Sequence, residues 1–146
     1  PLLRLRTLAP DGGAVLAASP VWWLLRGVRV DGHGDPFTLA GDLRDLFAAL
    51  CRSRVRTLAV HDLPAGDQAV DDLLDTGLYP RLTALALPGC GVSDEGAGRL
   101  AAHPHTPALR PLDLDRNNLS PVGFNALAAV GVHVSDRQFF LPGGWD

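Results

Sequence analysis

Histidine and aspartate residues that follow two short apolar segments are the first candidates for chemistry. The stretch VDGHGD, residues 30–35, places His33 among acids, and VHD, residues 60–62, places His61 beside another acid. Imidazole nitrogen and carboxylate oxygen both bind divalent metals, so a metal-dependent enzyme using His33 and His61 is one hypothesis. No compact ligand motif such as HExxH supports it. We therefore predict no metal and no cofactor, and expect His61 to pair with Asp31 across neighbouring strands.

The chain contains none of the common catalytic or nucleotide-binding motifs. It has no GxSxG segment, no phosphate-binding glycine loop and no paired-carboxylate motif. Its 13 basic and 16 acidic residues give a net charge of −3, which disfavours nucleic acid as a partner. No run approaches the roughly 18 apolar residues of a membrane span, and the spacing of the two cysteines suggests no disulfide. We predict a cytoplasmic protein that is not an enzyme and binds neither nucleic acid nor membranes.

A repeated apolar pattern runs through the chain and would position these residues. An apolar triplet recurs in steps of 30, 27 and 27 residues, and a fourth apolar residue follows eighteen residues after the first of each triplet. All sixteen are Leu or Val, namely Leu25, Val28, Val30 and Leu43; Val55, Leu58, Val60 and Leu73; Leu82, Leu85, Leu87 and Leu100; Leu109, Leu112, Leu114 and Leu127. Such periodicity predicts a stack of similar units.

Each unit is expected to contain one strand followed by one helix. The end of each triplet alternates between apolar and other residues, as in a strand with one buried face. Ser93 before Asp94, and Ser120 before Pro121, are good helix starts. The 30-residue unit is expected to have a longer helix, because apolar residues recur there at helical spacing, at Leu43, Leu46, Phe47 and Leu50.

An earlier, shorter unit precedes the four triplets. The segment LRTLAP, residues 5–10, is similar to VRTLAV, residues 55–60, so we align Leu5 with Val55. On this alignment the units begin near residues 5, 25, 55, 82 and 109. Stacked units share one continuous core, so we predict a single α/β solenoid over residues 1–134 with a curved parallel sheet.

One small polar position follows each of the last two strands. Cys90 and Asn117 occupy it, and we expect them to satisfy buried backbone groups of the tight turns there. Because Cys90 shares its position with an asparagine, we predict a structural role for it rather than a nucleophilic one. Gly96 and Gly123 recur in the helices that follow and are expected to permit close helix approach.

The last two units carry a family resemblance. LTALALPGCGV and LRPLDLDRNNL match the pattern LxxLxLxx(N/C)xL of leucine-rich repeats, and the 27-residue unit with alternating Cys and Asn resembles the ribonuclease-inhibitor type. The phrases DEGAGRLAAHP and SPVGFNALAAVG also look like bacterial leucine-rich repeat proteins of unassigned role. The resemblance implies a right-handed solenoid, with a concave parallel sheet, convex helices and a partner-binding concave face.

Outward strand residues of successive units should align in rows on that face. The rows combine arginines at the strand entrances, a small apolar middle and acids at the far edge, a mixture typical of protein contact surfaces. We predict a protein-interaction module or scaffold subunit whose partner-binding residues are Arg26, Arg29, Asp31, Arg56, Ala59, His61, Ala86, Asp113 and Asp115.

The segment after the repeats, residues 135–146, is unusually aromatic. Phe139, Phe140 and Trp145 lie outside the repeat pattern. We interpret the segment as a cap over the last unit or as a docking tail. The alternative to concave-face binding is therefore self-association, as a homo-oligomer, or docking in cis through this tail. We expect the chain to act either as a subunit of a complex or as the recognition domain of a larger bacterial polypeptide.

Overall fold

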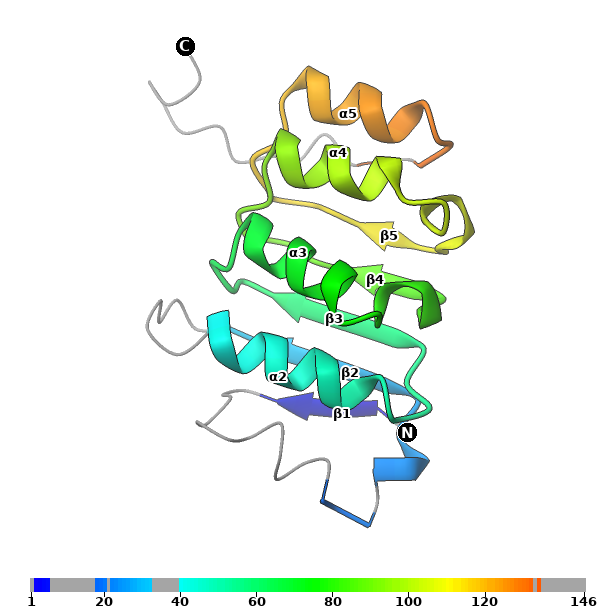
Figure 1. The fold of residues 1–146 in the computed structure, drawn as a ribbon. Coiled ribbons are helices and arrows are strands. Elements are labelled where there is room, and N and C mark those ends of the chain that lie inside the picture. The colour runs from blue at the N-terminus through cyan, green and yellow to red at the C-terminus, as the bar shows by residue number, and fades with distance from the viewer. Residues whose placement is uncertain (1, 6–17, 21, 33–39, 133, 135–146) are drawn as a thin grey trace.

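The fold is an α/β arrangement of one parallel sheet and its helices. A computed structural model describes residues 2–5, 18–20, 22–32, 40–132 and 134 (Figure 1). Its strands are β1 (Leu2–Leu5), β2 (Gly27–Asp31), β3 (Thr57–His61), β4 (Ala84–Ala86) and β5 (Leu112–Asp113). Its α-helices are α2 (Ala40–Leu50), α3 (Asp67–Asp75), α4 (Asp94–Ala102) and α5 (Pro121–Ala128). Short 3-10 helices precede three strands, at Trp22–Leu24, Tyr79–Arg81 and Thr106–Ala108.

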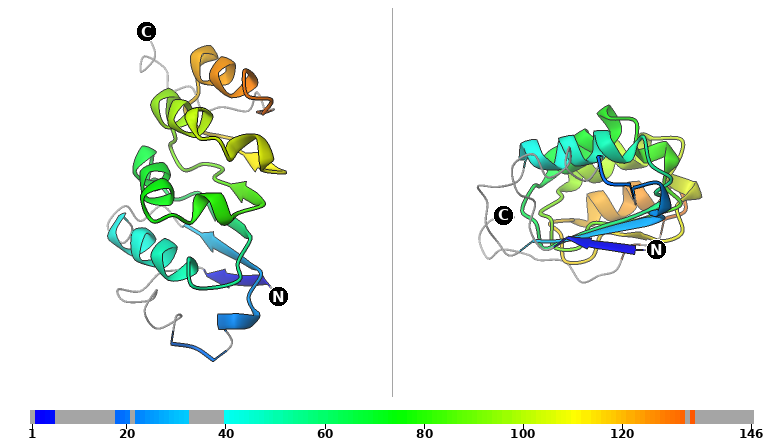
Figure 2. Two further views of the ribbon diagram at one scale, coloured as in Figure 1. Left: turned by 45° about the vertical axis from the view of Figure 1, so that its right-hand side comes forward. Right: turned by 90° about the horizontal axis from the view of Figure 1, so that it is seen from below.

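The five strands pair in chain order, each parallel to the next. The register places Val28 beside Leu58, Leu58 beside Leu85, and Leu85 beside Leu112. This is the alignment that the triplets predict. The α-helices all lie on one face of the sheet (Figures 1 and 2). The predicted α/β class with a parallel sheet is confirmed.

The repeated apolar residues form the core between sheet and helices. All sixteen predicted Leu and Val positions are buried, and the most accessible of them, Leu25, is only 7% exposed. The strands alternate as expected, because Arg29, Ala59 and Ala86 are half-buried between fully buried neighbours. A side chain on the helix-free face of the sheet is thus held in place by its buried neighbours along the strand.

The helix boundaries follow the local sequence signals. Ser93 and Ser120 cap α4 and α5, where each hydroxyl accepts a hydrogen bond from the backbone N–H two residues on. The helix in the 30-residue unit is longer, since α2 continues seven residues beyond Leu43 whereas α3 ends two residues beyond Leu73. Both predictions are confirmed.

The predicted alignment of the first unit is wrong. In the structure Leu3 pairs with Val28 and Leu5 with Val30, so β1 begins at Leu2. The alignment of Leu5 with Val55 places the strand several residues later. The expected alignment was based on a single short match, LRTLAP with VRTLAV. Such a match carries less information than a period that recurs along the chain.

The last described residues pack on the end of the core. Val132 and Val134 are buried, at 8% and 9% exposure, but lie outside the strands of the described chain. Phe139, Phe140 and Trp145 fall outside the described residues. None of the helices in the described ranges has the length and apolar character needed to cross a membrane.

Candidate functional site

The helix-free face of the sheet brings the predicted outward residues together in a row. The strand register places Arg29 beside Ala59, Ala59 beside Ala86, and Ala86 beside Asp113. Arg4 extends the row on the other side of Arg29. The sequence prediction missed Arg4 because the first unit was aligned incorrectly. We call this row and the adjoining strand ends the sheet face.

A second row continues at the strand exits. Asp31 and His61 are register partners. Beyond them the backbone N–H of Asp62 donates to the carbonyl of Pro88 (2.9 Å), and that of Gly89 donates to the carbonyl of Asp115 (3.0 Å). The pairing therefore continues past the strands themselves and keeps Asp115 in line with Asp31 and His61.

The predicted pair of His61 with Asp31 is not the contact that forms. The Asp31 carboxylate accepts a hydrogen bond from Arg29 Nε at 2.7 Å, two residues earlier on its own strand. This bond lowers the pKa of Asp31 below its usual value. Burial, followed by the charge of Arg29, lowers the pKa of His61. The cationic and acidic groups of β2 thus neutralise each other, and His61 favours its neutral form.

The acidic edge of the sheet face contains its own cation. Arg116 Nη1 lies 3.1 Å from Asp62 Oδ1. Both residues have positive φ, at 51° and 54°, and Gly89 has the same conformation in the unit between them. A Cβ at Gly89 would collide with the Asp62 carboxylate, so the glycine lets the two side chains meet across it. The sequence prediction missed this pair, whose members are two units apart.

Asn117 satisfies the turn of the preceding unit, as predicted. Its Oδ1 accepts from the backbone N–H groups of Cys90 (3.0 Å) and Val92 (3.1 Å), and its Nδ2 donates to the carbonyl of Leu87 (2.7 Å). Cys90 Sγ donates in turn to the carbonyl of Val60 (3.1 Å). Burial raises the pKa of Cys90 to about 12. A buried thiol with that pKa is protonated near neutral pH, which supports the structural role.

The two histidines of the AHPHTP segment also serve the fold. His105 Nε2 lies 2.6 Å from the carbonyl oxygen of Leu82, and His103 Nδ1 accepts from the backbone N–H of His105 (3.1 Å). The ring of Tyr79 meets both imidazoles edge-on, and its hydroxyl lies 2.6 Å from Thr106 Oγ1. These contacts join the connections before β4 and β5.

Arginines at the strand entrances line up as predicted. The backbone N–H of Arg56 donates to the carbonyl of Arg26 (2.9 Å), that of Thr83 to the carbonyl of Arg56 (2.7 Å), and that of Arg110 to the carbonyl of Thr83 (2.9 Å). Thr83 therefore occupies the same place in its unit as the three arginines. All four side chains are exposed.

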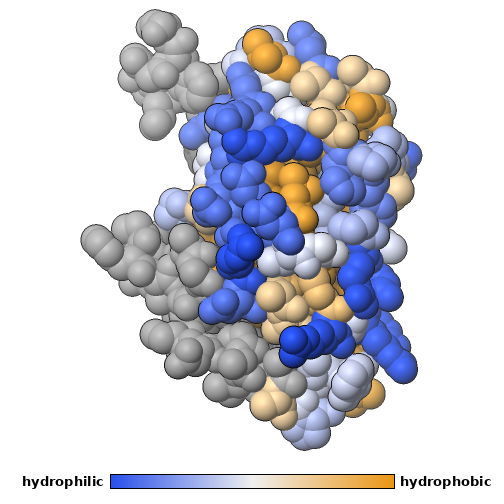
Figure 3. All heavy atoms as spheres, in the orientation of Figure 1, coloured by the Kyte–Doolittle hydropathy of each residue, from blue (hydrophilic) through white to orange (hydrophobic). Residues whose placement is uncertain are grey.

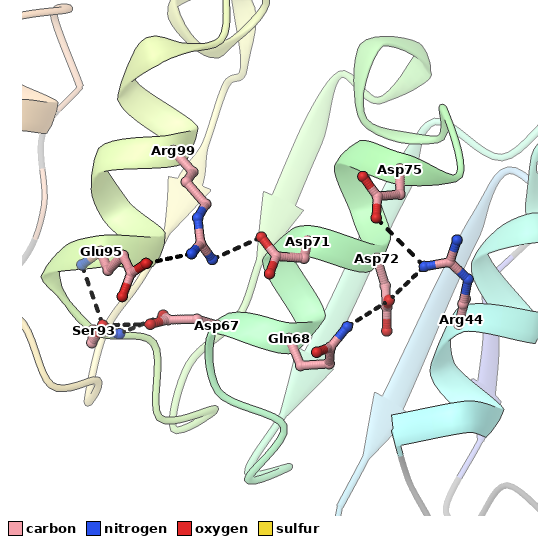
Figure 4. Close-up of polar contacts among 9 residues, drawn as sticks. All are labelled: Arg44, Asp67, Gln68, Asp71, Asp72, Asp75, Ser93, Glu95 and Arg99. Carbon is pink, nitrogen blue, oxygen red and sulfur yellow. Dashed lines mark hydrogen bonds and ion pairs between the residues drawn. The ribbon is translucent and has the colours of Figure 1, made fainter.

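On the helix side, by contrast, arginines are paired between neighbouring helices (Figure 4). Arg44 of α2 contacts Asp72 (3.1 Å) and Asp75 (3.6 Å) of α3. Arg99 of α4 contacts Asp71 of α3 at 2.8 Å. Figure 3 shows the surface on this side, which is largely hydrophilic, with apolar patches between the polar groups.

Acids in the first helical turns add a second link between units. The Asp67 carboxylate accepts from the backbone N–H of Ser93 (2.8 Å) and from its hydroxyl (2.5 Å). The Asp94 carboxylate bonds Ser120 in the same way and also accepts from the backbone N–H of Gly123 (3.1 Å). A Cβ at Gly123 would collide with Asp94, which confirms that this glycine permits close helix approach.

The metal hypothesis names His33 and His61, and the structure describes only the second of these residues. His33 lies outside the described residues. Among the residues that the structure describes, no group of three or more His, Cys, Asp or Glu could hold a metal ion.

Two comparisons with known proteins found no relative. No family model matches the chain, and no curated protein matches it either.

Proposed function

We propose that the chain is a leucine-rich repeat protein of the ribonuclease-inhibitor-like type, and that it serves as a non-catalytic protein-interaction module or scaffold subunit. Its partner binds to the sheet face, on the concave side of a right-handed solenoid whose helices are convex. The proposed binding residues are Arg26, Arg29, Asp31, Arg56, Ala59, His61, Ala86, Asp113 and Asp115.

Three features of the repeats support the family. The paired residues Leu58, Leu85 and Leu112 are 27 residues apart, and each occupies the same place in a parallel strand. The amide of Asn117 bonds the preceding turn from the position where the repeat pattern calls for Asn or Cys. In Figure 1 the strands point to the left, the helices lie in front of them, and each later unit lies above the last. This is the right-handed sense of connection.

The observation that carries the binding function is the composition of the sheet face. Small residues, Ala59 and Ala86, lie in its centre, with Arg4 and the mutually paired Arg29 and Asp31 to one side and Asp113 to the other. No α-helix of the described chain covers this face (Figure 2). A surface with a flat apolar centre and charges of opposite sign at its two sides can orient a partner that has the complementary charges.

A steric substitution tests the face directly. Ala86→Arg fills the centre of the sheet face, whereas Ala48→Arg adds the same side chain to the exposed surface of α2. The immobilised wild-type protein is used to capture binding proteins from the source organism. Each captured protein is identified and then tested for binding to the two variants. We expect at least one of them to bind the wild type and Ala48→Arg but not Ala86→Arg. Equal retention by all three proteins would contradict binding through this face.

Self-association at the end of the sheet is a second candidate. β5 pairs only with β4 in the described chain, and an open groove of about 460 Å³ lies at its edge, lined by Leu109, Arg110, Pro111, Leu112, Gly131 and Val132. An open strand edge can pair with another chain. The mass in solution of the full chain and of a chain without residues 137–146 tests this candidate. A monomeric mass for both proteins would exclude it.

A further inference from the structure

One edge of the molecule carries an excess of arginine. Six arginines lie in the connections that lead into β2, β3, β4 and β5, and all six side chains are exposed. We call this set the arginine edge. It consists of Arg26, Arg52, Arg54, Arg56, Arg81 and Arg110.

None of these six arginines forms an ion pair within the part of the chain that the structure describes. Among the described residues, Arg56 Nη1 donates to the carbonyl of Val55 (3.0 Å) and Arg81 Nη2 to that of Ser53 (3.1 Å). The described acids nearest in sequence have other partners: Asp113 accepts from the backbone N–H of Asp115 (2.9 Å), and Asp31 pairs with Arg29. Asp75, the last residue of α3, pairs with Arg44. A guanidinium group has five N–H donors, so most donors of the edge remain available to a ligand.

The backbone fixes the spacing of three of these arginines. Arg26, Arg56 and Arg110 share one ladder of hydrogen bonds, in which Thr83 takes the third place. Neighbouring parallel strands are about 4.8 Å apart, so the ladder spans roughly 14 Å from first to last. An extended polypeptide places alternate side chains roughly 6.8 Å apart, which lets about three carboxylates on one side of it face the ladder.

Exposed apolar side chains lie at the β2 end of the ladder. Trp23 and Leu24, which closely precede Arg26, are each 60% exposed, and Leu2 of β1 is 56% exposed. The Leu2 side chain reaches Gly27, since a Cβ built there would lie 3.0 Å from Leu2 Cδ1. Trp and Arg are the residue types that contribute most to protein interfaces.

We propose that the arginine edge binds an extended acidic segment of the partner protein, with a large apolar side chain that contacts Trp23 and Leu24. The inference rests on the proposed function and adds the chemistry of the partner. A polypeptide fits better than a nucleic acid, because the chain has 16 acidic and only 13 basic residues, and its net charge of −3 repels a long polyanion.

Fluorescence anisotropy with a labelled probe peptide tests this binding. The probe has about ten residues, with alternating Glu and Ser and a Leu at one end. A control peptide carries Gln in place of each Glu. Both are measured in about 50 mM salt, where exposed charges are weakly screened. We expect the Glu peptide to bind and the Gln peptide not to bind. Binding of both peptides alike, or of neither, would overturn the proposal.

Two variants locate the binding on the edge. Arg56→Gln with Arg110→Gln should weaken the affinity for the Glu peptide roughly tenfold, since two guanidinium–carboxylate pairs are lost. Thr83→Arg fills the vacant place in the ladder and should tighten binding by about threefold. The matched control, Val122→Glu with Asn125→Glu on the exposed side of α5, lowers the net charge by the same two units. It should change affinity less than about twofold.

The outcomes also separate this inference from the proposed function. An equal loss in the α5 control, or tighter binding of a single-stranded oligonucleotide of equal charge, would overturn the acidic-segment proposal. If Ala86→Arg still prevented the partner from binding, the sheet-face proposal would remain supported.

Discussion

Arginine serves two purposes in this molecule, one on the helix side and another at the strand entrances. On the helix side, Arg44 and Arg99 each reach carboxylates of the neighbouring helix. At the strand entrances, Arg56 and Arg110 bond only carbonyl oxygens of their own connections among the described residues. Contacts between units should contribute to stability, whereas contacts within a loop contribute little and leave the charge available.

The largest loss of stability is expected where a polar side chain joins two units inside the core. Asn117→Ala removes the partners of two buried backbone N–H groups and one carbonyl. We expect the free energy of unfolding to fall by about 3 kcal/mol, because each unpaired buried group costs roughly 1–3 kcal/mol. Urea denaturation measures it. The neighbouring Asn118→Ala should cost less than about 1 kcal/mol, and equal losses would contradict the role assigned to Asn117.

Substitution of the two helix-side arginines, Arg44 and Arg99, should lower the free energy of unfolding by different amounts, because their acidic partners differ in burial. The Asp72 side chain is only 2% exposed, whereas Asp71 is 36% and Glu95 is 73% exposed. Arg44→Ala leaves a buried carboxylate with Gln68 as its remaining side-chain partner, so it should lower the free energy of unfolding more than Arg99→Ala does, whose partners stay hydrated. The midpoints of urea unfolding test this order, which the reverse result would refute.

At the strand entrances the expected change in stability is smaller still. Arg56→Gln with Arg110→Gln should alter the free energy of unfolding by less than about 0.5 kcal/mol, as exposed substitutions usually do. A loss as large as that of Arg44→Ala would show that these arginines support the fold, and would remove the contrast between the two regions.

The smallest expected effect is the contribution of His61, on the sheet face, to the pH dependence of stability. The lowered pKa of His61 lies below the usual 6.5, so the unfolded chain takes up the proton first as the pH falls. Stability is therefore complete above about pH 6.5 and decreases as the pH falls through the lowered pKa. His61→Gln should reduce the difference in unfolding free energy between about pH 7.5 and pH 5.5. An unchanged difference would contradict the burial of the imidazole.

Periodic features of the fold could be predicted from the sequence. Leu85 and Leu112 lie in one register because a 27-residue period repeats the same local structure. The same period places Ala86 beside Asp113, so the central row of the sheet face was predictable. Ser93 and Ser120 mark helix starts through local hydrogen bonds that sequence reasoning can anticipate.

Features without a period could not be predicted. The pair of Arg116 with Asp62 depends on two residues with positive φ and on Gly89 between them, and no short sequence pattern reports a contact across two units. The burial of Asp72 is equally hidden, since its neighbour Asp71 has the same side chain and faces solvent more. The register of β1 failed because a degenerate unit offers too few repeated positions to fix it.

Stability and affinity measured together on the same variants test the central claim, that one set of arginines holds the units together and the other binds the partner. Urea unfolding and anisotropy with the acidic peptide are recorded for Arg44→Ala and for Arg56→Gln with Arg110→Gln. We predict that Arg44→Ala loses stability and keeps its affinity for the peptide, and that the double variant keeps its stability and loses affinity. Parallel losses of both quantities in both variants would contradict the claim.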